Sequence, residues 1–114
     1  MEESEVTALV DELAEYARVL DASFDEINPL MLASVAAQVR ETLTPLYEIL
    51  ENGPTPLRNA IGGAWVAMQS AGSIEGQLAL AELDWDRVGG VVSFTAIGLQ
   101  ELHADWSRVL GNNA

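Results

Sequence analysis

The first quarter of the chain repeats apolar residues with the spacing of an α-helix. Its apolar stripe consists of Val6, Leu9, Val10, Leu13, Tyr16, Ala17, Leu20, Phe24 and Ile27. Mostly acidic residues occupy the opposite face, which is the pattern of a helix lying on a core. We predict a helix over about residues 4–26. Ser4 is its expected N-cap, and it should end before Asn28 and Pro29, because the residue preceding a proline is disfavoured in the α conformation.

A second apolar stripe predicts a helix over about residues 29–51, with Asn28 as its cap and Pro29 at its first position. The stripe contains Leu32, Val35, Ala36, Val39, Leu43, Leu46, Tyr47 and Leu50. Pro45 lies within it and removes one intrahelical hydrogen bond, so we expect a kink there or a helix restart capped by Thr44. The short connection between the two helices predicts an antiparallel helical hairpin.

The segment over about residues 57–71 is rich in small residues, which favours a helix packed closely against a neighbour. These residues are Ala60, Gly62, Gly63, Ala64, Ala67 and Ala71. Glycine inside a helix costs about 1 kcal/mol relative to alanine, so close packing against the hairpin is expected to offset it. Gly72 and Ser73 are the pattern of a helix stop followed by a cap, and a short helix should then cover about residues 74–83.

The last helix should begin at Asp84, as its cap, and continue to about residue 110. Residues 91–97 have the composition of a strand, but a strand needs a partner and the chain offers no second candidate. A helix is therefore favoured over this run as well. Residues 111–114 are expected to fray.

Together these elements predict an all-α fold in a single domain of residues 1–114. The hairpin of residues 1–52 would pack with two or three further helices from residues 55–110, giving a four- to five-helix bundle. A chain of 114 residues is long enough for an independently stable core.

The net charge of −13 changes the range of partners that the chain can have. Twelve acidic residues stand in residues 1–52, against Arg18 and Arg40 alone. Nucleic acids and anionic membranes are both disfavoured as partners, since each requires clustered Lys and Arg. A basic protein surface would be attracted, although acidic surfaces also serve solubility alone. No apolar run reaches the ~20 residues of a membrane span, and the acidic start lacks the features of a secretory signal, so a cytoplasmic location is expected.

The reactive side chains that most enzymes use are scarce. The chain has no Cys, no Lys and one His, which removes thiolate sites, Schiff bases and two-histidine metal motifs. His103 stands between Glu101 and Asp105, but residues two apart on a helix face different directions. The run from Asp84 to Gly89 begins like a calcium loop but has Val88 at a ligand position, so helix capping is the better interpretation. We therefore expect no enzyme activity, no cofactor and no metal site.

The tryptophans are the remaining candidates for function. Trp106 lies on an apolar stripe and should be core, whereas Trp85 lies between two acids and is a candidate interface residue. The candidate partner interface consists of Trp85, Asp11, Glu12, Glu15 and Asp25. The sequence thus favours a non-enzymatic protein-binding module, an adaptor, chaperone or inhibitor, that presents an acidic helical surface to a basic protein partner. The alternatives are a structural homo-oligomer, such as a homodimer, and, with less support, a small-ligand-binding or enzymatic bundle.

Overall fold

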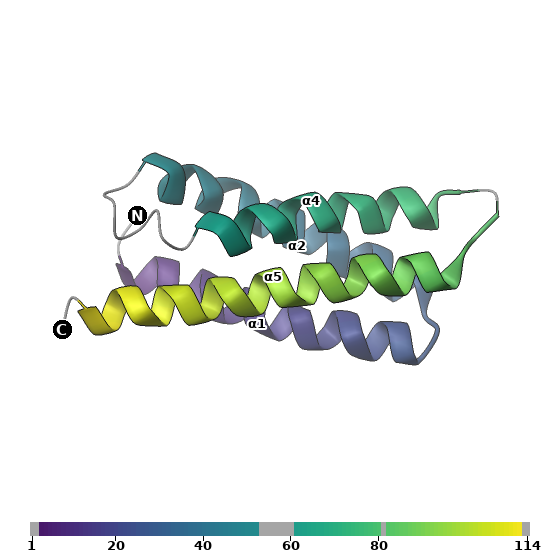
Figure 1. The fold of residues 1–114 in the computed structure, drawn as a ribbon, viewed down its shortest axis with the longest axis horizontal. Helices are drawn as coiled ribbons and strands as arrows, with labels where there is room; N and C mark the ends of the chain where they lie inside the picture. Colours follow the sequence, from purple (N-terminus) through teal and green to yellow (C-terminus); the bar gives the residue numbers. More distant parts are fainter. Residues whose placement is uncertain (1–2, 53–60, 81, 113–114) are drawn as a thin grey trace.

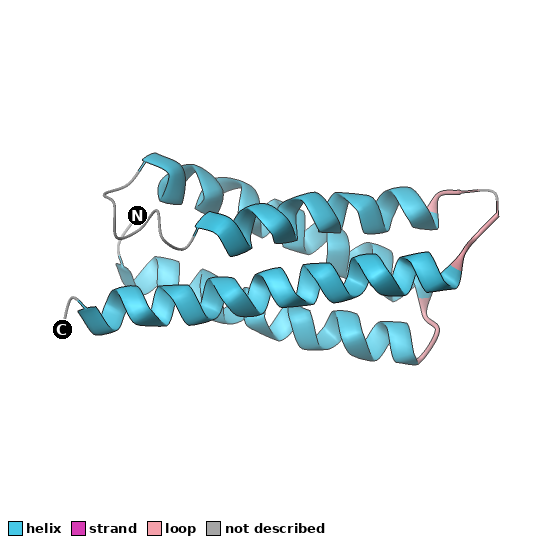
Figure 2. Ribbon diagram, viewed as in Figure 1, coloured by secondary structure: helices cyan, strands magenta, loops and turns pink. Residues whose placement is uncertain are grey.

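The computed structural model describes residues 3–80 and 82–112 except for 53–60, and within them the chain forms four α-helices. They are α1 (Glu3–Asp25), α2 (Pro29–Asn52), α4 (Ile61–Leu78) and α5 (Trp85–Asn112). No strand occurs in this part of the chain, and residues 91–97 are helical (Figure 2). The all-α class predicted from the hydrophobic pattern is confirmed.

The four helices form an elongated antiparallel bundle of 48 × 22 × 18 Å (Figure 1). Each helix packs against two others, α1 and α4 both lying between α2 and α5. Because successive helices run in opposite directions, the α1–α2 and α4–α5 connections lie at the same end of the bundle (Figure 1). We call this end of the bundle the turn end. It holds two connections that are far apart in the sequence.

The core is built from the predicted apolar stripes. Its buried side chains include Leu13, Leu20, Leu32, Leu43, Leu46, Leu50, Ile74, Leu99 and Leu102. Trp106 is buried, as predicted, and its indole N–H donates to the hydroxyl of Thr7 at 2.9 Å. The first two helices match the predicted ranges to within a residue. Ser4 lies inside α1 instead of capping it.

α2 continues without interruption through Pro45. The helix restart at Thr44 is therefore wrong, and the hydroxyl of Thr44 instead donates to the carbonyl oxygen of Arg40, one turn earlier, at 2.8 Å. A bend at Pro45 stays a prediction.

The predicted break at Gly72 and Ser73 is also wrong, because α4 runs through both residues. The hydroxyl of Ser73 donates to the carbonyl oxygen of Gln69, one turn earlier in α4, at 3.2 Å, so Ser73 is not the N-cap of a new helix. Glu75, two residues after Ser73, forms a 2.6 Å ion pair with Arg40 of α2. The two helices predicted over 57–83 are thus one helix in the described part of the chain. The predicted start near residue 57 lies outside the described residues.

The small-residue helix α4 packs on α2 of the hairpin, as predicted, and makes its closest backbone approach to α5. A Cβ atom added at Gly98 would lie 2.8 Å from the backbone nitrogen of Ala67 and 2.9 Å from the carbonyl oxygen of Gly63. A Cβ atom at Gly63 would lie 2.6 Å from the carbonyl oxygen of Gly98. Glycine is therefore required at both positions for the two backbones to touch. α5 continues two residues past its predicted end, and residues 113–114 of the predicted tail lie outside the described residues.

Candidate functional site

The α1–α2 turn contains a backbone conformation that is unusual for its residue. Ile27 has a positive φ of 54°, the left-handed region that favours glycine. The N–H of Asn28 donates to the carbonyl oxygen of Ser23 at 2.9 Å, and the N–H of Ile27 to that of Phe24 at 3.0 Å. This is the Schellman pattern that closes a helix, with isoleucine at the position where glycine is usual. Asn28 then caps α2, as predicted, by accepting a 3.1 Å bond from the N–H of Met31.

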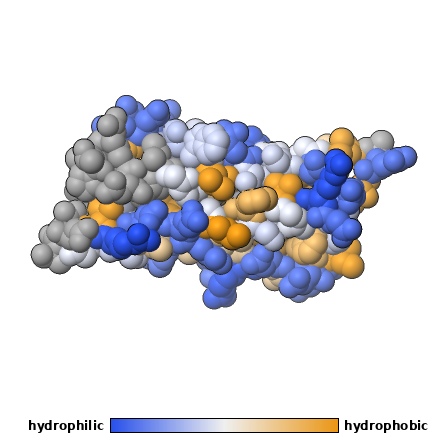
Figure 3. Space-filling view, in the orientation of Figure 1, coloured by the Kyte–Doolittle hydropathy of each residue, from blue (hydrophilic) through white to orange (hydrophobic). Residues whose placement is uncertain are grey.

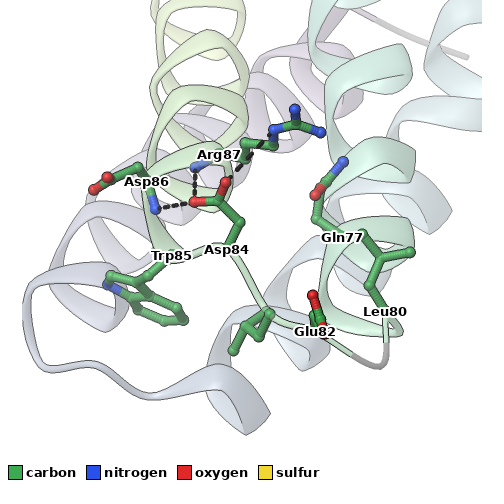
Figure 4. Close-up of a pocket in the computed structure, with 8 residues that line it drawn as sticks. Gln77, Leu80, Glu82, Asp84, Trp85, Asp86 and Arg87 are labelled. Carbon is green, nitrogen blue, oxygen red and sulfur yellow. Dashed lines mark hydrogen bonds and ion pairs between the residues drawn. The ribbon is translucent and has the colours of Figure 1, made fainter.

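Asp84 fixes the start of α5 in the way that the sequence predicts. Its Oδ1 accepts hydrogen bonds from the N–H groups of Asp86 at 3.1 Å and Arg87 at 3.3 Å. The Nε of Arg87 lies 3.6 Å from the other carboxylate oxygen of Asp84 (Figure 4). The carboxylate is thus used in capping, so the calcium-loop interpretation finds no support here.

Trp85, the first residue of α5, is held by an aromatic stack. Its ring is parallel to that of Phe24 at the end of α1, with 5.1 Å between centroids and 7° between planes. Gly89 makes room for this arrangement, because a Cβ there would lie 2.6 Å from Cζ of Phe24. The indole is therefore half-buried and oriented by contacts from a different helix.

An open pocket of about 480 Å³ lies beside Trp85, between the end of α4 and the start of α5. It is lined by Gln77, Leu80, Glu82, Leu83, Asp84, Trp85, Asp86 and Arg87 (Figure 4). The lining thus holds three carboxylates and one guanidinium group. The side-chain oxygen Oε1 of Gln77 is buried and accepts no hydrogen bond. The surface of the pocket thus combines an excess of negative charge with an aromatic side chain.

Five large apolar side chains are exposed at the turn end, on the α1–α2 turn, in the first turn of α2 and on the α4–α5 connection, and two of them line the pocket. They are Ile27 (69% exposed), Leu30 (84%), Met31 (45%), Leu80 (50%) and Leu83 (47%), and we call them the apolar end. In the space-filling view, orange apolar surface is visible at the right-hand side of the molecule, where the turn end lies, as separate spots with blue hydrophilic surface between them (Figure 3). Large apolar side chains exposed beside polar residues are a common feature of interaction sites.

The five residues of the predicted interface do not converge on one place. On the exposed face of α1, Asp11 lies 3.2 Å from the imidazole Nε2 of His103 on α5. Glu12 accepts a 2.6 Å bond from the hydroxyl of Tyr16, and Glu15 pairs with Arg18 at 3.1 Å. These carboxylates have partners within the chain.

Only Asp25 and Trp85 of the predicted interface lie near the turn end. Asp25 is the last residue of α1 and follows Phe24, on which Trp85 stacks. Fourteen residues of helix separate Asp25 from Asp11, a distance of about 21 Å at 1.5 Å per residue. The acidic face of α1 is thus an extended surface, and Trp85 lies beside the C-terminal end of this helix.

Two side chains of α1 have shifted pKa values. Desolvation by burial and the charge of Asp25 both raise the pKa of the Asp21 carboxyl above 3.8. The hydrogen bond to Glu12 is the largest cause that raises the pKa of the Tyr16 hydroxyl above 10.0, and burial adds to it. A neighbouring carboxylate contributes to each shift, but the largest cause is burial for Asp21 and the hydrogen bond for Tyr16.

The placement of Ile27 on the apolar stripe of the first helix is wrong, because Ile27 lies beyond the end of α1 and is 69% exposed. The other exposed apolar side chains of the turn end were missed by the sequence analysis. Leu30 and Leu83 fall outside the helical stripes, next to Pro29 and Asp84, and this position in the sequence is the signal that could have marked them. His103 was considered with its helical neighbours, whereas its contact is across the bundle with Asp11.

The described part of the chain offers neither a metal site nor a membrane-spanning helix. In the described ranges, no three His, Asp or Glu side chains are grouped so that they could hold a metal ion. None of the helices that the structure describes has the length and apolar character needed to cross a membrane. Comparison with protein-family models, with curated proteins and with solved structures found no match.

Proposed function

We propose that the protein is a non-enzymatic protein-binding module, an adaptor, chaperone or inhibitor, that docks a basic protein through its turn end. The observation that carries the proposal is the apolar end, where five large apolar side chains from separate parts of the chain are exposed at the same end of the bundle. Burial of apolar surface stabilises a complex by roughly 25 cal/mol per Å². A partner that covers these side chains would recover this free energy.

The conformation of Ile27 supports the proposal. A left-handed conformation costs an L-residue roughly 1–2 kcal/mol, and Ile27 is 69% exposed, so its burial in the isolated chain offsets little of that cost. An apolar side chain held in an unfavourable conformation at the surface is consistent with selection for contact with another molecule.

The charge distribution supports a basic partner. Asp25, Glu26, Glu82 and Asp86 flank the apolar end, and the whole chain carries −13. Charges of this kind attract an oppositely charged surface over roughly 10 Å at 0.1 M salt. The proposed module is one domain of residues 1–114 that works without a cofactor and without direct contact to nucleic acid or membrane. A cytoplasmic location belongs to the proposal, since small extracellular domains commonly depend on disulfides and this chain has no cysteine.

A matched pair of variants tests the docking surface. The Leu30→Gln/Leu83→Gln variant removes two exposed apolar side chains from the turn end, and Phe94→Gln/Ile97→Gln removes two from the middle of α5. The immobilised wild-type protein should capture a partner from a native lysate and release it in salt. The first variant should retain less than about one tenth of that partner, and the second should retain it fully. Equal capture by both variants, or no capture by the wild type, would contradict the proposal.

A homodimer is the second candidate function, and exposed side chains of α5 favour it. Phe94 is 63% exposed and Ile97 is 49% exposed, one turn apart on the outer side of the bundle. Two copies could cover these side chains by packing side by side along the 48 Å length of the molecule. Sedimentation velocity should then show a dimer for the wild type and a monomer for Phe94→Gln/Ile97→Gln. A monomeric wild type at high concentration would exclude this candidate.

A further inference from the structure

We propose that the pocket beside Trp85 receives an arginine side chain from a basic and apolar segment of the partner protein. This inference rests on the proposed function, because it names the chemistry of the partner that docks at the turn end. It is carried by the pocket itself, by the charges that line it and by the aromatic side chain of Trp85.

The charge of the pocket selects a cation. Glu82, Asp84 and Asp86 contribute three carboxylates to the lining, and Arg87 contributes the one cationic group among the lining residues. Arg87 is already paired with Asp84 at 3.6 Å. The remaining negative charge is exposed around a concave surface, where a partly desolvated cation would be attracted more strongly than on an open face.

The Gln77 amide lies on the α4 side of the pocket, across from Asp84 and Arg87 on the α5 side (Figure 4). Its Oε1 atom is enclosed by the protein, so a ligand in the pocket would not reach it. A ligand that brings N–H groups into this space would donate to the carboxylates that line it.

The aromatic and apolar walls favour arginine over lysine. Trp85 is fixed by its stack on Phe24, and a planar guanidinium group can pack on an indole ring while donating in several directions. Leu80 and Leu83 provide apolar surface for the methylene stem of the side chain. The same leucines belong to the apolar end, so the residues next to the arginine in the partner should be apolar.

Three short peptides test the inference directly. They are acetyl-Leu-Arg-Leu-amide, the same peptide with lysine, and the same peptide with citrulline, which keeps the shape of arginine without its charge. Binding is followed through the indole N–H signals in ¹H–¹⁵N spectra of the complete chain, where Trp65 and Trp106 serve as internal references for Trp85. The arginine peptide should shift the Trp85 signal saturably, and the citrulline peptide should bind at least about tenfold more weakly, since charge-assisted hydrogen bonds are lost. The lysine peptide should fall between them.

Two charge-matched variants separate the pocket from the general acidity of the chain. Glu82→Gln/Asp86→Asn removes two carboxylates from the pocket, and Asp11→Asn/Glu15→Gln removes two from the middle of α1. The first variant should weaken the arginine peptide by about three- to tenfold, and the second should leave its affinity unchanged. Equal binding of the arginine and citrulline peptides, equal weakening by both variants, or no shift of the Trp85 signal would each overturn the inference.

Failure of the arginine site can be distinguished from failure of the proposed docking surface. If the leucine variant loses the captured partner while the pocket does not prefer arginine, docking at the turn end stands and the arginine site is wrong. If the pocket prefers arginine but capture does not depend on Leu30 and Leu83, the site stands and the proposed docking surface is wrong.

Discussion

The contact between α4 and α5 provides a sharp test of the packing, because one substitution should have opposite effects at two positions of the same helix. A Cβ atom at Gly98 would lie 2.8 Å from the backbone nitrogen of Ala67, about 0.6 Å short of the 3.4 Å at which ordinary contact begins. The obstructing atoms belong to the backbone, so no side chain can rotate away. A Cβ atom at Gly90 would meet nothing within 4 Å.

The difference between the two alanine variants isolates the packing energy. Both gain the helix propensity of alanine, which is about 1 kcal/mol more favourable than glycine in a helix interior. Gly98→Ala must also separate two helices, and overpacking of this kind costs about 1–3 kcal/mol. Gly90→Ala should therefore raise the free energy of unfolding by about 0.5–1 kcal/mol. The free energy of unfolding of Gly98→Ala should be about 1–3 kcal/mol lower than that of Gly90→Ala.

Urea denaturation followed by circular dichroism measures both variants. With a slope of about 1–3 kcal/mol per M, the two midpoints should differ by roughly 1 M, the Gly98→Ala midpoint being the lower. If Gly98→Ala were as stable as Gly90→Ala, the two backbones would not lie in contact at this position, and the reasoning would be refuted.

The remaining predictions concern α1. Because the folded chain holds the proton of Asp21 more tightly than the unfolded chain, its contribution to stability should grow as the pH falls through the raised folded pKa toward 3.8. Asp21→Asn should remove this contribution, and an identical pH dependence of the melting temperature in wild type and variant would contradict it. Glu12→Gln should lower the pKa of Tyr16 toward 10.0 in an ultraviolet titration, and an unchanged value would show that the hydrogen bond is not its main cause. Thr7→Val should cost about 1–3 kcal/mol, because the buried indole N–H of Trp106 loses its acceptor; Thr7→Ser is the control, and equal losses in both variants would contradict this.

The helices could be predicted from the sequence wherever a continuous apolar stripe and a local cap agreed. The stripes of α1 and α2, the cap at Asn28 and the cap at Asp84 depend on residues within a few positions of one another. The break at Gly72 failed because the local signal was outweighed by a contact between helices. A methylene carbon of Arg40 lies 3.8 Å from the position of a Cβ on Gly72, and Arg40 pairs with Glu75 in the next turn of α4. Such a contact joins residues more than thirty positions apart and leaves no periodic signal.

The candidate site was less accessible to sequence analysis for the same reason. Trp85 could be selected from its acidic neighbours, but its stack on Phe24 joins the first residue of one helix to the end of another. The apolar end combines Leu30 with Leu83, and each alone is an ordinary exposed leucine next to a helix start. Only the antiparallel order of the four helices places the two connections at one end. A stripe analysis finds the faces that form the core, and it passes over apolar residues that lie outside every stripe.

Acidic residues and apolar side chains have different ranges of action, and the structure separates them in space. The carboxylates of α1 act over roughly 10 Å at 0.1 M salt, so they can orient an approaching partner without contacting it. Several of them, such as Glu12 and Glu15, already have partners within the chain and gain little from a second contact. The apolar end acts at van der Waals distance and loses its exposed surface only in the complex. In the proposed function, the acidic face would therefore govern the rate of association, and the turn end would govern the lifetime of the complex.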